Sequence, residues 1–108
     1  MSEAAPDIRS VLAGLIGHTI PTLTGKPNKI LRVVGDEVWV GTRKSPRGQP
    51  VPILEVQEAA DRLYRYGEVE ISVPSVGYRS AFVGAVLSSL PDTVTRTRPR
   101  SVLLSGRT

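Results

Sequence analysis

The sequence has no cysteine and a single histidine, and both shortages narrow the chemistry open to it. Without cysteine the chain can form no disulfide, no thiolate zinc site and no thiol nucleophile, which fits a reducing compartment. It also lacks any apolar run long enough to cross a bilayer. Residues 1–6 lack the charged start and apolar run of a secretory signal. We therefore expect a cytoplasmic protein that does not engage a membrane.

Patterns for catalysis and metal binding are missing as well. The lone His18 stands near the end of an expected helix, where a capping role is more typical than ligation. Glu55, Glu58 and Asp61 follow one helix face with no histidine nearby, which favours a solvated surface over a metal site. The segment around Lys26 lacks the first glycine and the final Ser or Thr of a phosphate-binding loop. We expect no enzyme, no metal and no cofactor.

The charge that is present is segregated along the chain. The 108 residues suffice for one domain, and the net charge is +4. Half of the ten acids fall between positions 55 and 70, whereas positions 26–32, 43–47 and 96–107 are basic and free of acids. Segregation of this kind is the usual footprint of a protein that binds a polyanion.

Hydrophobic periodicity predicts an α+β fold. Apolar residues at helical spacing predict helices over 8–16, with Asp7 as its cap, over 52–66, ending at Gly67, and from about Ser75 or Gly77 to Leu90. Strands are predicted over 22–24, 30–34, 38–40, 69–73 and 94–100, with a turn at Gly35 and a loop over 43–50. We expect a small winged-helix-like domain over 1–92, with three helices and a β-hairpin or small antiparallel sheet, followed by a basic strand or tail over 93–108.

Candidate DNA contacts gather in four places. Tyr78, Arg79 and Ser80 open the third expected helix, where the helix dipole favours phosphate. The others are basic side chains and one amide on the first β-turn, the 43–50 loop and the last strand: Lys26, Asn28, Lys29, Arg43, Lys44, Arg47, Arg96 and Arg98. In a winged-helix geometry the third helix would enter a groove of duplex DNA, and the basic turn would reach phosphates as a wing does.

Several of these segments resemble a known domain. The run from Gly25 to Ile30, the Val38, Val40 and Thr42 pattern, and the segment from Arg79 to Pro91 are similar to a small domain fused to bacterial restriction endonucleases, including HNH-type and modification-dependent ones. The resemblance covers roughly positions 10–92. It implies a sequence- or modification-dependent DNA-binding module of a restriction or phage-defence system, partnered by a nuclease domain or subunit that does the cutting.

A second hypothesis comes from a different class. The expected strand after Pro91 could pair, as an exposed edge, with a partner protein or with a second copy of the chain. The protein would then be an interaction adaptor or a dimerisation domain.

Overall fold

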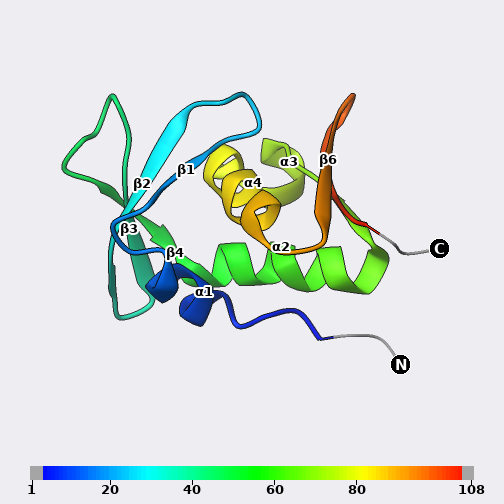
Figure 1. The fold of residues 1–108 in the computed structure, drawn as a ribbon, viewed down its shortest axis with the longest axis horizontal. Helices are drawn as coiled ribbons and strands as arrows, with labels where there is room; N and C mark the ends of the chain where they lie inside the picture. Colours follow the sequence, from blue (N-terminus) through cyan, green and yellow to red (C-terminus); the bar gives the residue numbers. More distant parts are fainter. Residues whose placement is uncertain (1–3, 106–108) are drawn as a thin grey trace.

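The computed structural model describes residues 4–105, in which four helices accompany two antiparallel sheets (Figure 1). The first sheet has the order β1 (Thr19–Pro21), β2 (Pro27–Val34), β3 (Glu37–Gly41) and β4 (Gln49–Pro52). The second has the order β5 (Glu68–Glu70), β7 (Arg100–Leu104) and β6 (Thr93–Thr97). The helices are α1 (Ile8–Gly14), α2 (Ile53–Tyr66), α3 (Val73–Val76) and α4 (Ser80–Ser89). The predicted α+β class is confirmed.

The first sheet is a meander, and most of the caps, turns and strands in this part of the chain were predicted from the sequence. Asp7 caps α1 by accepting the N–H of Arg9 at 3.2 Å. Gly35, with φ of 58°, makes the predicted tight turn between β2 and β3. The strand predicted over 22–24 is wrong, because that segment is the turn, and β1 precedes it. Residues 49 and 50 belong to β4 rather than to the loop, and proline is tolerated there because β4 is an edge strand.

The second sheet is built from the end of the described chain. Helix α2 ends as predicted at Gly67, whose φ of 83° provides the left-handed C-cap. The strand predicted over 69–73 is shorter, at Glu68–Glu70, and Val73 begins α3 instead. Of the segment expected as a strand or tail, residues 93–97 form the edge strand β6. Residues 100–104 form the central strand β7, whose Val102 is fully buried.

The third predicted helix is two helices, so the expectation of three helices is corrected to four. Gly77, with φ of 93°, separates α3 from α4 because this backbone conformation cannot continue a right-handed helix. Arg62 holds the short α3 in place by donating from Nη1 to the carbonyl of Ser75 at 2.6 Å and from Nη2 to its hydroxyl at 2.8 Å. The side chain of Arg62 therefore connects α2 to α3.

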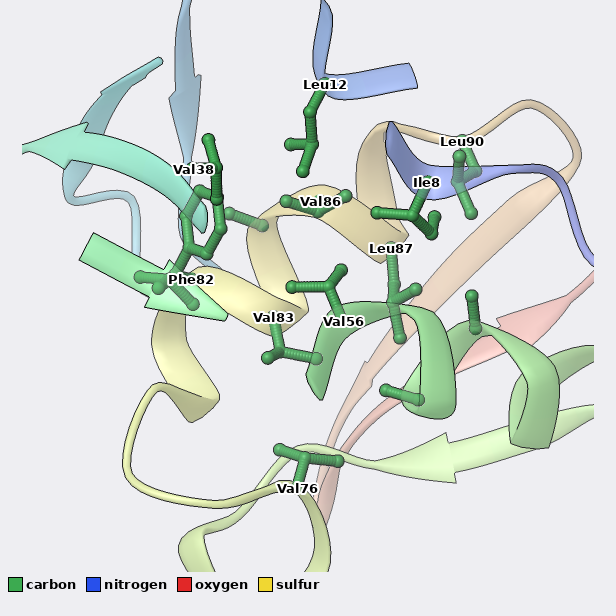
Figure 2. Close-up of a cluster of buried hydrophobic side chains, with 14 of the residues drawn as sticks. Ile8, Leu12, Val38, Val56, Val76, Phe82, Val83, Val86, Leu87 and Leu90 are labelled. Carbon is green, nitrogen blue, oxygen red and sulfur yellow. The ribbon is translucent and has the colours of Figure 1, made fainter. Parts of the chain in front are cut away.

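Helix α4 is the centre of the core (Figures 1 and 2). Its residues 82–87 are all buried, and the helix contacts β1 of the first sheet, β6 and β7 of the second, and α2. Figure 2 shows Val83, Val86 and Leu87 close to Val56 of α2, with side chains of α1 on the other side. A helix that is apolar on every side is expected to be enclosed by other elements, as α4 is.

We expect the last strand to be part of the cooperative core. Val102→Ala should lower the free energy of unfolding by about 1–3 kcal/mol, because it opens a cavity at a fully buried site. Val94→Ala, on the neighbouring edge strand and 49% exposed, is the matched control and should change it by less than about 0.5 kcal/mol. Urea denaturation would measure both. Equal effects would mean that β7 is not packed as described.

Candidate nucleic-acid interface

A hollow lies between two loops and the start of α4. It has a volume of about 430 Å³. Its lining comes from the turn between β1 and β2, the first two residues of β2, the loop between β3 and β4, and one helical residue: Thr22, Thr24, Gly25, Lys26, Pro27, Asn28, Thr42, Arg43, Lys44 and Ala81. Four of the predicted contact residues, Lys26, Asn28, Arg43 and Lys44, are therefore brought together. Among the described residues 4–105, no acid lines the hollow.

The turn that carries Lys26 is closed by its own hydrogen bonds. The N–H of Thr22 donates to the carbonyl of Lys26 at 2.9 Å, and the N–H of Lys26 donates to the hydroxyl of Thr22 at 3.0 Å. Gly25 has a φ of 87°, a conformation that favours glycine. The side chain of Leu23 packs against the backbone of α4, since the Cγ of Leu23 would lie 3.5 Å from a Cβ added to Gly84. The turn is thereby fixed to the core.

The loop of residues 42–48 is fixed by a bulge in the neighbouring strand. The register of β2 against β3 shifts between Ile30 and Arg32, so that Leu31 is the extra residue. Leu31 packs beneath the loop: a Cβ added to Gly48 would lie 2.7 Å from its Cδ1. Trp39 alternates with the buried Val38 and Val40 and is half-buried on the outer face of the sheet, with the guanidinium of Arg32 4.5 Å from the centroid of its ring.

Arg79 joins this loop to the start of α4. Its Nη1 donates to the Oε1 of Gln49 at 3.1 Å, and the Nε2 of Gln49 donates to the Oγ of Ser45 at 3.1 Å. The two hydrogen bonds link the residue before α4 to the loop and to the start of β4, which lie 30 positions or more earlier in the sequence. Arg79 was predicted as a DNA contact, and in the structure it is half-buried and bonded to the root of the loop.

The start of α4 borders the hollow. Ala81 is exposed and lines it, and Ser80 lies beside it in a smaller hollow of about 50 Å³ shared with Arg100. Lys29 lines a third hollow, on the other side of Pro27 and Arg43. The three hollows share lining residues and therefore adjoin. We call the surface around them, which carries Lys26, Lys29, Arg43, Lys44 and Arg100, the basic surface. It runs from β2 across the start of α4 to the beginning of β7.

The remaining predicted residues lie around this surface or away from it. Arg47 is exposed on the 42–48 loop, Tyr78 is 92% exposed in the turn before α4, and Arg98 is exposed in the turn between β6 and β7. Figure 1 shows the loop between β3 and β4, the turn between β6 and β7, and the turn between β1 and β2 on the same side of the molecule, opposite α2. Arg96 is engaged elsewhere, since its Nη2 forms an ion pair with Glu68 at 2.7 Å.

The sequence reasoning missed the threonines and Ala81. Thr22, Thr24 and Thr42 each precede a basic residue by a few positions, but hydroxyl residues beside turns are common and gave no distinct signal. Ala81 contributes because of where the backbone places it, which no side-chain pattern reveals.

No protein family, curated protein or solved structure was found to match this chain. The role of the basic surface therefore has to follow from its own geometry and charge. Within residues 4–105 no group of three metal-ligating side chains occurs. In that same part of the chain no helix has the length and apolar character needed to span a membrane.

The seating of the 42–48 loop is testable at Gly48. Gly48→Ala should destabilise the protein by more than Gly17→Ala, which carries a similar positive φ but has nothing within 4 Å of its added Cβ. The Gly17 variant should lose about 1–2 kcal/mol from backbone strain alone. Gly48→Ala adds a clash with Leu31. Thermal unfolding of both variants makes the comparison, and equal losses would contradict the contact with Leu31.

Proposed function

We propose that this domain binds DNA through the basic surface around the 430 Å³ hollow. The observation that carries the proposal is the convergence of Lys26, Arg43 and Lys44, from two separate loops, on the start of a helix with no acid among the lining residues. A cluster of cations without counter-ions attracts phosphates, because binding releases the condensed cations of the DNA. The exposed acids Glu58 and Asp61 lie on α2, which runs along the opposite side in Figure 1.

The burial of α4 limits how this helix can contact DNA. In the winged-helix arrangement expected from the sequence, a helix face would lie along the major groove. Residues 82–87 of α4 are buried, so in our proposal only its N-terminal end meets the DNA. The loops at 22–26 and 42–48 act as the wings, and the exposed ring of Tyr78 offers a surface for stacking or hydrogen bonding.

The biological setting follows the resemblance described above. We propose that recognition depends on the sequence or modification of the DNA, and that the domain serves a restriction or phage-defence system. A separate nuclease domain or subunit would then do the cutting.

Single charge removals test the proposal. Lys26→Ala, Arg43→Ala and Lys44→Ala should each weaken duplex binding and make the slope of log K against log salt less negative by about 0.9, because each loses one phosphate contact. Arg65→Ala, an exposed arginine of α2 with the same charge change, is the matched control and should leave the slope unchanged. Fluorescence anisotropy with duplex DNA at several salt concentrations gives both quantities. Affinity that does not depend on salt would overturn the proposal.

A second candidate function rests on β6. This strand pairs only with β7, so its other edge is free within residues 4–105, and its Val94 is 49% exposed. An unpaired edge of this kind can accept a strand from another protein or from a second copy. Removing residues 92–108 would not test this function cleanly, because it would also remove the buried strand β7.

A single substitution on the edge strand is the better test. If the chain self-associates through β6, its mass in solution should rise with concentration, and Val94→Lys should abolish that rise because a charge opposes pairing between edges. The unfolding temperature should stay unchanged, since the side chain is exposed. Sedimentation velocity over a range of concentrations makes the measurement. A monomer at every concentration and no partner captured by the wild-type chain would exclude this function.

A further inference from the structure

We infer that the hollow at the start of α4 is a built site for one phosphate ester group, held by the amide of Asn28 and by backbone N–H groups of the helix. The inference rests on the proposed DNA binding and sharpens it. It distinguishes a specific seat for one phosphate from a general attraction to basic side chains.

The first argument is the state of Asn28. The residue is only 6% exposed and lines the hollow from β2. Within residues 4–105 its amide makes no hydrogen bond to another residue. The amide atoms of Asn28 are nevertheless accessible. Within residues 4–105, the side-chain polar atom that is both enclosed and without a hydrogen bond belongs to another residue, Oε2 of Glu55. The polar atoms of Asn28 are therefore open to the hollow, and its NH₂ group offers two donors there.

The burial of this amide needs a reason. Burial removes most of the water that would otherwise hydrate an amide, so polar side chains are uncommon in a buried and otherwise apolar row. The neighbouring inward positions of β2 and β1 hold Ile30 and Ile20, which are buried and apolar. A polar residue in this row is explained if it serves a ligand.

The second argument is the open start of α4, a helix of 10 residues. Two N–H groups at the start of the helix have an acceptor: the N–H of Ser80 donates to the carbonyl of Gly77 at 3.1 Å, and the N–H of Val83 donates to the carbonyl of Arg79 at 2.9 Å. The N–H groups of Ala81 and Phe82 lie between these and make no hydrogen bond within residues 4–105. The side chain of the N-cap residue Arg79 makes no capping hydrogen bond, and no acid lies in the first turn. Such N–H groups and the positive end of the helix dipole favour a phosphate.

The third argument is charge and size. Lys26, Arg43 and Lys44 supply positive charge around the same space. The volume of about 430 Å³ lies in the range of sites for small ligands, so a phosphate can enter with the sugar to which it is attached. The group can be an internal phosphodiester of a strand or a terminal phosphomonoester, and the experiment separates the two.

Two variants of Asn28 isolate the site from the general basic surface. Asn28→Leu removes the donors and leaves an apolar residue in an apolar row. Its unfolding temperature should equal or exceed that of the wild type, whereas its affinity for phosphate should fall at least about tenfold, one charge-assisted hydrogen bond being worth about 1.5–3 kcal/mol. Asn28→Asp keeps the shape and adds a negative charge, so it should bind phosphate more weakly still. Arg65→Ala lies on α2, away from the hollow, and is the control, with little change expected in either property.

The measurement is a series of amide NMR titrations of the intact chain. The probes are inorganic phosphate, a deoxynucleoside 5′-monophosphate, and a short duplex with and without 5′-phosphates. We expect saturable shifts of the backbone amides of Ala81 and Phe82 and of the side-chain amide of Asn28, lost in Asn28→Leu. Equal binding of both duplexes identifies an internal phosphodiester as the ligand. Binding that requires the 5′-phosphate identifies a strand end.

The outcomes separate the two proposals. If duplex DNA binds with the expected salt dependence but these three amides do not move, or if Asn28→Leu binds as the wild type does, the phosphate site is wrong and the proposed DNA binding stands. If the monophosphate binds at Asn28 but neither duplex binds at low salt, the proposed function is wrong and the site stands.

Discussion

Helix α4 is enclosed by both sheets and by α2, and its backbone approaches them closely at Gly84. A Cβ added there would lie 2.9 Å from Cγ2 of Ile71 and 3.5 Å from Cγ of Leu23. Ile71 follows β5, and Leu23 belongs to the turn that carries Lys26. One close approach therefore sets the distance from the helix to the second sheet and to the basic turn. The site depends on this packing, because its parts come from separate segments that only the core brings together.

The same packing limits what the domain can offer a ligand. A helix buried over residues 82–87 cannot present a face, so what remains is its N-terminal end and the loops around it. These loops are held at their roots: Leu31 supports the 42–48 loop, and Arg79 ties that loop to the turn before α4 through Gln49. A rigid scaffold that positions loops is a common basis for binding, because the loops are then ordered before the ligand arrives.

Features encoded by neighbouring residues could be predicted from the sequence. The sequence predicted the Asp7 cap, the turn at Gly35 and the end of the long helix at Gly67, since each depends on a few adjacent positions. The break at Gly77 was missed because the apolar spacing continues across it. The contact of Arg79 with Gln49 spans 30 positions, and the open amide of Asn28 depends on which neighbours fail to reach it. Neither leaves a pattern in the sequence.

The place of β7 also governs the order in which the chain can fold. It is the middle strand of the second sheet, yet it is made after the two strands that it joins. During synthesis β5 has no strand to pair with until residues 100–104 have left the ribosome, some 30 positions later. Until then Val69 and the side of α4 that faces this sheet stay uncovered. Folding of this half is therefore delayed until β7 has been synthesised, and a nascent chain stalled before residue 100 would expose an apolar surface of the kind that chaperones bind.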